Sequence, residues 1–536
     1  MGPIPGLAGV CNCFTRSGAK VVNLSTDIKK RGLKLCRVVA NDGASLMAGR
    51  RGFLTYSGAA LGAALVPTTT TAASRLEDQY RTVIDVVEEG ADNGGNESIT
   101  PLLRDLRGSN TLLKFPEGRY YMDSQLRFTG FEQFGMVGYD ATLVPANFHD
   151  FDGPQFRLFR LGTADRPGRD LRVEGFRVDQ TASDTGIRFL NGEVTDGLFV
   201  QDIYINGRHD SGTWGPGLFN ITEPGGSGIV RRFRAGDGGV HVDDTPNAGN
   251  MWRGPTGIVS NKHHRGRLTF EGCVLGGFPD NGLYCWGGTG EIRVNRGWFQ
   301  NSATASIRLG ARRSRISGAV IRINRARNRE TRQHGVRLDY CDWATLEGLS
   351  FRLPRPNGYA LRVMDDVGGV SMRDCDLTVG QRTNTAIRID PETGPVYING
   401  ADITFDGGGN AIRVLGQQAG RVGLQDVSIT GDASGSPMYY AIYAERDGVR
   451  FRDLYIDQRG DSNRRGIELN GRDSLLYECE LTTTDYPIVV NGDEAWIERC
   501  HATTTEGRAS INLSSVAGDN IRLKNNEFPD GVRDSR

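Results

Sequence analysis

The chain has 536 residues, with 64 Lys plus Arg balanced by 64 Asp plus Glu, and 73 glycines. A formal net charge of zero excludes a bulk field that would draw the protein to nucleic acid or to an anionic membrane. A chain of this length normally divides into several domains, but a repeat array has no single core to outgrow and can absorb it as one unit.

The first predicted element is an export signal over residues 47–74. Arg50 and Arg51 precede Phe-Leu, a mildly apolar stretch and a Thr-rich tract that ends Ala-Ala-Ser. This order resembles a twin-arginine (Tat) export signal, which implies a protein that is secreted or displayed at the cell surface. A short buried helix with a chance arginine pair is the alternative. Because such a signal belongs at a terminus, we expect translation to start at Met47, with residues 1–46 an extension that is not translated.

Residues 75–150 are expected to form an N-terminal cap. A predicted helix over residues 99–106 is followed by a strand over residues 111–121 that contains Phe-Pro-Glu-Gly-Arg-Tyr-Tyr. This order resembles the opening segment of the pectate-lyase-like superfamily, whose members are right-handed parallel β-helix proteins. A cap has a physical reason, because the open edge of a first parallel coil invites aggregation unless it is covered.

One short unit then recurs over residues 151–536. Residues 370–377 and 385–389 form two period-2 apolar runs, and residues 396–403 and 410–414 repeat them. Such runs between Gly/Asn/Asp-rich turns predict two half-buried strands. The unit recurs after roughly 20–30 residues without a helix between, as in a solenoid. The predicted fold class is all-β, a single-stranded right-handed parallel β-helix of about 12–14 coils, where a coil is one circuit of the solenoid.

Four cysteines are expected to be small core residues. Cys273, Cys375, Cys479 and Cys500 occupy an inward slot of the first strand that aliphatic residues fill in other coils. Cys479 and Cys500 fall in successive coils, where a disulfide is geometrically feasible. The sequence has no Cys/His spacing typical of a metal site, so no cofactor is predicted. Calcium stays an open alternative without a specific motif to support it.

The second strand of each unit directs one side chain outward between two inward apolar neighbours. Down the coils, this column is predicted to start at Arg188 and Phe219, and five successive coils place an arginine in it: Arg308, Arg337, Arg362, Arg388 and Arg413. Like charges about 4.8 Å apart repel unless acids or a ligand compensate them. One hypothesis is neutralisation by nearby carboxylates, namely Asp339, Asp365, Asp366 and Asp390. The other is a basic strip that binds an extended acidic polysaccharide.

Three coils carry candidate catalytic residues. Asp280 and Asn281 open one second strand, His334 opens a later one, and Arg362 lies in the next. Their order is similar to that of polygalacturonase-family glycoside hydrolases, although Thr-Ala-Ser stands at residues 304–306 in place of the family's aspartate pair and Met364 in place of its lysine. The resemblance implies Asp280, Asn281, His334 and Arg362 as catalytic residues. We expect His334 to be the general acid or base, because its unperturbed pKa lies near neutrality.

An insertion over residues 238–265 is expected on the binding face, because long excursions from a solenoid usually lie there. Asp243, Asp244 and His263 within it lack a metal-specific spacing. Indole rings that could stack on sugars lie in or near these coils, although ordinary packing explains any one of them equally well: Trp214, Trp252, Trp286 and Trp298. The residues expected to bind substrate are Tyr284, Trp286, Arg308, Arg337, Arg388 and Arg413.

The sequence thus predicts a secreted protein that acts on an acidic polysaccharide, as a lyase-like or hydrolase-like enzyme. A hydrolase needs two carboxyl groups, whereas a lyase needs a base and positive charge. The alternative is a non-catalytic glycan-binding or structural rod at the cell surface. An enzyme should gather its titratable groups in one cleft, whereas a rod should spread them. We expect no nucleic-acid partner and no membrane insertion after signal removal; the sugar, the linkage and the oligomeric state stay open.

Overall fold

The computed structural model describes residues 76–153, 155–326, 332–381, 385–433, 439–460 and 463–536. All of them belong to one compact unit, Thr68–Arg536. The predictions of an export signal over residues 47–74 and of a start at Met47 lie outside the described residues. None of the helices in the described ranges is both long enough and apolar enough to cross a membrane.

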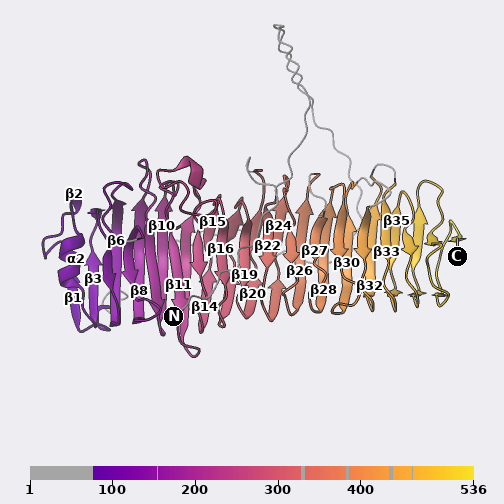
Figure 1. The fold of residues 1–536 in the computed structure, drawn as a ribbon, viewed down its shortest axis with the longest axis horizontal. Helices are drawn as coiled ribbons and strands as arrows, with labels where there is room; N and C mark the ends of the chain where they lie inside the picture. Colours follow the sequence, from indigo (N-terminus) through magenta and orange to yellow (C-terminus); the bar gives the residue numbers. More distant parts are fainter. Residues whose placement is uncertain (1–75, 154, 327–331, 382–384, 434–438, 461–462) are drawn as a thin grey trace, which may run out of the picture. The chain divides into compact units, whose positions relative to one another are not determined.

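The strands of this unit stack in parallel into two sheets, one of 16 strands and one of 25 (Figure 1). The unit is a right-handed parallel β-helix, which confirms the predicted fold class. The 16-stranded sheet holds one strand of each coil: β5 (Leu126–Phe128), β7 (Arg157–Leu161), β9 (Arg188–Val194), β11 (Gly217–Ile221), β13 (Ile258–Ser260), β16 (Asn281–Trp286), β19 (Ala305–Gly310), β22 (His334–Leu338), β25 (Leu361–Val363), β27 (Thr385–Ile389), β29 (Asn410–Val414), β31 (Tyr440–Ala444), β33 (Arg465–Leu469), β36 (Ile488–Val490), β39 (Ile511–Leu513) and β41 (Val532–Asp534).

The solenoid has more coils than the predicted 12–14, because three strands of the 16-stranded sheet lie outside the recognisable repeat. These are β5 and β7 at its start and β41 at its end. The opening segment, which was predicted to be a cap, therefore contributes coils. Its predicted helix is α2 (Thr100–Leu106), and its predicted single strand is two strands, β3 (Thr111–Phe115) and β4 (Gly118–Met122). β3 pairs in parallel with β6 (Glu132–Pro145), which pairs with β8 (Arg169–Asp179).

The core has the predicted register. Val370 and Met372 of β26 (Val370–Val379), and Ile387 and Ile389 of β27, are fully buried, whereas the Arg388 side chain between the last two is partly exposed. The predicted core cysteines are buried as well, and all four are free thiols: Cys273, Cys375, Cys479 and Cys500. The disulfide considered for Cys479 and Cys500 is therefore not formed in this structure.

Each coil has a corner that the alternating pattern did not predict. In β26 the buried positions Met372 and Cys375 are three residues apart, because Asp374 between them has a left-handed backbone with φ of 51°. The next strand, β28 (Val396–Phe405), has Gly400 at this corner with φ of 65°. Gly, Asn and Asp accept this conformation most readily. The predicted first strand is thus two segments, and each coil has three straight sides.

Candidate functional site

The five arginines predicted to form a column are neighbours in the 16-stranded sheet. Arg308 pairs with Arg337, Arg337 with Arg362, Arg362 with Arg388, and Arg388 with Arg413. We call this row the arginine ladder. Such a ladder arises wherever an outward position recurs at the same point of successive coils, because parallel strands stack in register.

The predicted start of the column is wrong. Upstream of Tyr284 the column continues through Val259, Leu218 and Asn191, so Phe219 and Arg188 do not belong to it. Phe219 is fully buried. Arg188 is only 2% exposed and donates from Nε to the Gly215 carbonyl at 2.8 Å. The prediction is one residue out of register at Phe219 and three residues out at Arg188, and any odd shift moves a side chain to the other face of a strand. These early coils have longer loops that hide their register.

Two buried carboxylates compensate part of the ladder. Asp339 accepts hydrogen bonds from Arg308 at 2.6 Å and from Arg337 at 2.9 Å. Asp390 accepts from Arg362 at 2.9 Å and from Arg388 at 2.5 Å. The side chains of Asp339 and Asp390 are 4% and 2% exposed. Two of the four predicted acids therefore pair with the ladder.

The compensation is incomplete. Asp365, which was also expected to pair with the ladder, accepts the backbone N–H of Glu392 instead, at 3.1 Å. Arg413 lies over the Tyr443 ring, with its Cζ 5.3 Å from the ring centroid. Among the described residues, five arginines against two carboxylates leave the ladder with a net positive charge.

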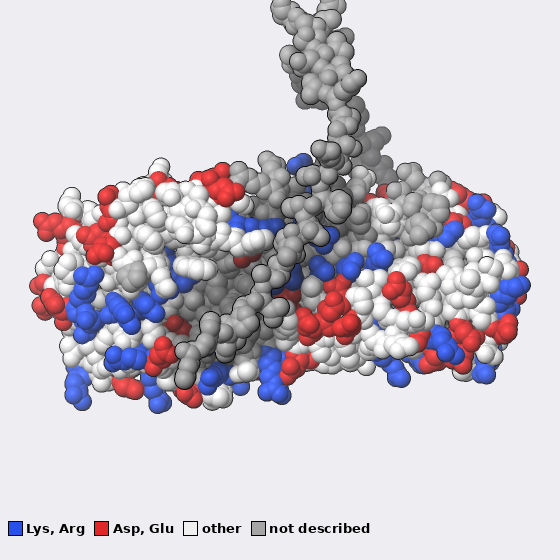
Figure 2. Space-filling model, viewed as in Figure 1, with Lys and Arg blue, Asp and Glu red and all other residues white. Residues whose placement is uncertain are grey.

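Part of the ladder lines a cleft of about 610 Å³, which we call the ladder cleft. Six of the predicted site residues lie in its wall: Asp280, Tyr284, Arg308, His334, Arg337 and Arg362. Trp252, one of the indoles that could stack on sugars, lies in the wall as well, together with three residues that were not predicted to act there: Arg253, Thr304 and Arg332. Trp252 belongs to the long insertion and is 78% exposed, so the insertion reaches the ladder as expected. On the face drawn in Figure 2, several basic side chains lie near the middle of the unit.

Asp280 is the only carboxylate among the described wall residues of the ladder cleft. Its Oδ1 accepts a hydrogen bond from the Thr304 hydroxyl at 2.9 Å, and its Oδ2 accepts one from the Thr256 hydroxyl at 2.8 Å. Thr304 stands where the resembling family has an aspartate, and here it positions the acid of another coil. Neither threonine could be assigned this role from the sequence, because each lies 24 residues from Asp280.

Asn281, predicted to be catalytic beside Asp280, does not face the cleft. It is fully buried in β16, and neither its Nδ2 nor its Oδ1 has a hydrogen-bond partner among the described residues. Successive side chains of a strand point to opposite faces, so Asp280 and Asn281 cannot both face the ladder. Arg388, Arg413 and Trp286 also lie outside the cleft wall.

His334 differs from the predicted acid–base group. Its imidazole is 2% exposed, stacks on Tyr359 with the ring centroids 5.2 Å apart, and accepts the Tyr359 backbone N–H at Nδ1. Burial, followed by the charges of Arg362 and Arg337, lowers the pKa of His334 to about 3. The ring is therefore neutral near pH 7, and its remaining proton lies on Nε2. This geometry favours a fixed hydrogen-bond donor over a group that exchanges protons at neutral pH.

Aromatic rings flank the cations. Arg308 lies over the Tyr284 ring, 4.5 Å from its centroid, and Trp286 stacks beside Tyr284 with the centroids 6.4 Å apart. Burial raises the pKa of Tyr284, so its phenol keeps its proton. All six tryptophans of the chain are exposed at the surface: Trp214, Trp252, Trp286, Trp298, Trp343 and Trp496. Exposed rings beside fixed guanidinium groups suit a ligand with both apolar ring faces and negative charge.

Metal binding was left open by the sequence. Within the ranges that the structure describes, no group of three or more His, Cys, Asp or Glu side chains is placed to hold a metal ion.

Comparisons with known proteins find relatives in fold only. No family model and no curated protein matches the chain. Among solved structures 22 chains match. One is the ORF18 protein of Geobacillus virus E2, at 12% identity and a TM-score of 0.29, with 71% of this chain and 61% of that protein covered. This chain thus spans less than two thirds of that protein.

Two further matches cover most of both chains. The tailspike protein of E. coli bacteriophage HK620, solved with a pentasaccharide, is 10% identical with a TM-score of 0.35, and 84% of this chain and 81% of that chain are covered. The adhesin PfbA of Streptococcus pneumoniae is 10% identical with a TM-score of 0.30, with 85% and 93% covered. Similarity at this level says nothing about what the present chain binds.

Proposed function

We propose that the protein binds an acidic polysaccharide in the ladder cleft. The observation that carries this proposal is the composition of the cleft wall, which holds five arginines and one carboxylate among the described residues: Arg253, Arg308, Arg332, Arg337, Arg362 and Asp280. Guanidinium forks match planar carboxylates and sulfates, and these bonds are stronger than neutral ones. Tyr284 and Trp252 supply rings on which sugars stack. The buried Asp339 and Asp390 hold the ladder side chains in place for the ligand.

A matched pair of variants tests the proposal. Arg337 and Arg388 lie in the same column, and each shares one buried aspartate with a neighbouring arginine, but only Arg337 lines the cleft. We expect Arg337→Gln to weaken binding about tenfold or more, since a charge-assisted hydrogen bond contributes about 1.5–3 kcal/mol. Arg388→Gln should have a much smaller effect.

The measurement is calorimetric titration with a panel of polyuronates and sulfated glycans at several salt concentrations. Binding should weaken as salt rises, because ions screen exposed charges. Equal effects of the two variants on every glycan, or no effect of either, would identify the ladder as a neutralised structural column.

A second candidate function is cleavage of the same polymer by β-elimination, which the placement of Asp280 favours. In such a step Asp280 would take the proton from the sugar C5, the electron pair would form a C4–C5 double bond, and the C4–O bond would break. The leaving oxygen would take a proton from water. An arginine on the uronate carboxylate would stabilise the charge that develops. His334 would be a positioning donor.

The Asp280→Asn variant separates cleavage from binding. If Asp280 is the base, turnover should fall by about 10²–10⁴-fold, whereas affinity should be kept or should rise because a negative charge leaves an anion site. The assay is the absorbance of unsaturated uronates, with reducing ends counted in parallel. If the wild-type protein binds a glycan but releases no product, the protein is the non-catalytic binding or structural rod.

We also propose that the protein reaches the outside of the cell through the Tat pathway and belongs among pectate-lyase-like β-helix proteins. The first part rests on Arg50 and Arg51 and the segment after them, and the second on the Phe-Pro-Glu-Gly strand and the solenoid. A polysaccharide ligand agrees with both, because such polymers lie outside cells.

A further inference from the structure

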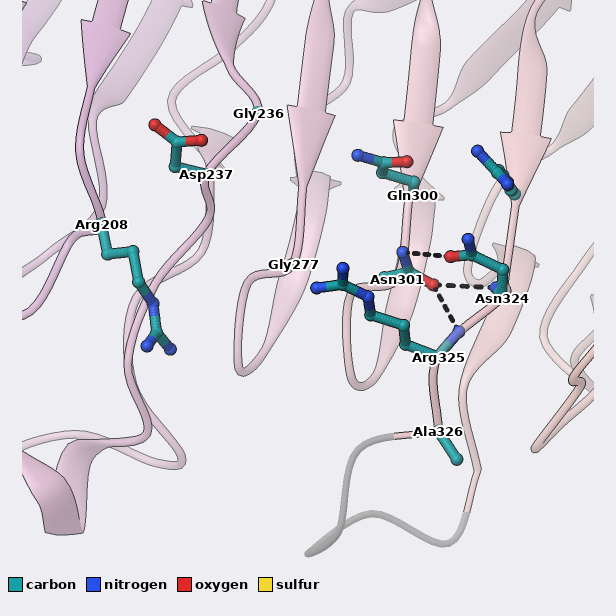
Figure 3. Close-up of a pocket in the computed structure, with 10 residues that line it drawn as sticks. Arg208, Gly236, Asp237, Gly277, Gln300, Asn301, Asn324, Arg325 and Ala326 are labelled. Atoms are coloured by element: carbon teal, nitrogen blue, oxygen red, sulfur yellow. Dashed lines mark hydrogen bonds between the residues drawn. The ribbon is translucent and has the colours of Figure 1, made fainter. Parts of the chain in front are cut away.

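A second basic pocket lies next to the ladder cleft, at the ends of strands of the 25-stranded sheet. It has a volume of about 610 Å³ and lies where β12 (Ser227–Ala235), β15 (Val274–Gly276), β18 (Trp298–Gln300) and β21 (Val320–Arg322) end. We call it the turn pocket. Figure 3 shows Arg208 on one side of it and Arg325 on the other, with Gly277 between them in this view.

Among the described residues, the cations of this pocket have no acidic partner, in contrast to a neighbouring arginine. Arg322 pairs in register with Gln300 on one side and with Arg352 on the other. Arg352 makes two hydrogen bonds to Asp376, at 2.9 and 2.7 Å. Of the described carboxylates, none forms an ion pair with Arg208, Arg322 or Arg325, although Asp237 also lines the pocket. Three arginines and one aspartate give the pocket a net positive charge.

An asparagine pair fixes the position of Arg325. The Asn301 Oδ1 accepts the backbone N–H groups of Asn324 at 3.0 Å and of Arg325 at 3.1 Å, and its Nδ2 donates to the Asn324 Oδ1 at 2.8 Å. These bonds tie the backbone that carries Arg325 to the preceding coil. The guanidinium therefore starts from an ordered backbone, which lowers the entropy lost when it binds an anion.

Glycine leaves the pocket open. A Cβ added at Gly236 would meet only the Val274 Cγ1, at 3.8 Å, and Gly236 does not have a left-handed backbone. The space beside Gly236 is therefore free for a ligand, and it is also free for an introduced side chain. This position offers a way to fill the pocket without removing an arginine.

The turn pocket and the ladder cleft are separated by only a few residues of chain. In one coil Gly277 lines the pocket and Asp280 lines the cleft; in the next coil Asn301 lines the pocket and Thr304 the cleft. Each connection is three residues, which spans at most about 10 Å when extended. A polymer seated in the cleft therefore reaches the pocket by crossing one turn of the solenoid.

We propose that the turn pocket binds carboxylate or sulfate groups of the same acidic polysaccharide, so that the polymer crosses the solenoid at this turn. The inference rests on the proposed function of the ladder cleft. It predicts that long oligosaccharides contact both sites, whereas short ones fill the cleft alone. The gain in affinity with length would come from linked binding of one chain at two sites.

The test introduces a charge at Gly236. Gly236→Glu places a carboxylate in the pocket, and Gly236→Gln is the neutral control of nearly the same shape. Polygalacturonate fragments of graded length and, in a parallel series, heparin fragments of graded length are titrated into each protein. Polygalacturonate carries carboxylates only, whereas heparin carries both carboxylates and sulfates, so binding of heparin alone would show that sulfate is required. Arg322→Gln with Arg325→Gln is the second test, with Arg352→Gln as its control because Asp376 already neutralises that arginine.

For long fragments we expect Gly236→Glu to bind about tenfold more weakly than Gly236→Gln, and the double arginine variant to be weakened to a similar degree. Short fragments should bind all of these proteins equally. Arg337→Gln should weaken binding at every length. If only Arg337→Gln has an effect, the turn pocket is no subsite and the proposed function stands. If no fragment binds the wild type, both proposals fail.

Discussion

Single buried side chains join the coils of this solenoid. Arg446 is fully buried and donates to carbonyls of two preceding turns: at 2.9 Å to Leu415 and at 2.8 Å to Gly420 in one turn, and at 3.2 Å to Gly394 in the other. A fourth bond, of 2.9 Å, reaches the Asp390 carbonyl. Burial lowers the pKa of Arg446 to about 10, so the guanidinium is still charged near neutral pH. Arg446 thereby orders the backbone of Asp390, the carboxylate that pairs with Arg362 and Arg388 of the ladder.

Replacing Arg446 should destabilise the fold strongly. Arg446→Met keeps the volume but leaves buried carbonyls without donors, so the free energy of unfolding should fall by about 3 kcal/mol or more. The measurement is the urea unfolding midpoint. Arg459→Met is the control, because Arg459 is exposed and pairs with Asp457 at the surface; a change within about 0.5 kcal/mol is expected there. Equal shifts in both variants would contradict the role assigned to Arg446.

Buried histidines should make stability depend on pH. Burial is the main cause that lowers the pKa of His209 and His334 to about 3 and of His264 to about 4, from an ordinary 6.5. Between pH 6.5 and these lower pKa values, the unfolded chain therefore binds more protons at its histidines than the folded chain does. Stability should be complete above pH 6.5 and should be lost progressively as the pH falls toward 4.

The His334→Gln variant checks this dependence. Glutamine cannot take up a proton, so the variant should lose less stability than the wild type between pH 6.5 and 4, although both also lose the contribution of their carboxylates. The measurement is the unfolding midpoint at a series of pH values. Parallel profiles for the two proteins would show that His334 is protonated equally in both states.

The register of the strands depends on the corner residue that bends each coil. Asp374 and Gly400 hold left-handed backbones at the same point of successive coils, with φ of 51° and 65°. Aspartate and glycine tolerate this region, whereas a β-branched residue is strained in it. The arginine ladder depends on these corners, because a missing corner would shift the register of the strands that follow.

Asp374→Val should therefore destabilise the protein by about 1–2 kcal/mol, whereas Ser371→Val, at an outward position of the same strand, should be nearly neutral. Urea unfolding of the two variants measures the difference. A large loss from Ser371→Val and none from Asp374→Val would mean that strand packing, and not the corner, limits stability here.

Across the whole chain, the proposed export predicts a defined N-terminus. Cleavage after Ala72 or Ala73 would leave a mature protein that starts just before the first described residues. N-terminal sequencing of the protein recovered from the outside of expressing cells should find that start, and Arg50→Lys with Arg51→Lys should keep the protein inside. Exported protein that retains residues 1–46 would contradict both the export signal and the start at Met47.

The sequence alone was sufficient to predict the solenoid and most of the ladder. Inward residues such as Ile387 and Ile389 recur with period 2 in coil after coil, and stacking in parallel then places Arg388 and its equivalents in one row. Where long loops separate the coils, as at Phe219, the same pattern predicted the wrong register, because a shift of one residue leaves the apolar composition almost unchanged while it reverses the face.

Only the tertiary structure decided how the site is built. Asp339 is shared by Arg308 and Arg337 because two coils meet there, and Asp280 is held by hydroxyls 24 residues away in each direction. His334 was expected to titrate near neutrality, but burial among arginines of neighbouring coils lowers its pKa to about 3. Periodicity predicts which way a side chain points, whereas its hydrogen-bond partners and its pKa depend on the burial and charge that residues distant in sequence create around it.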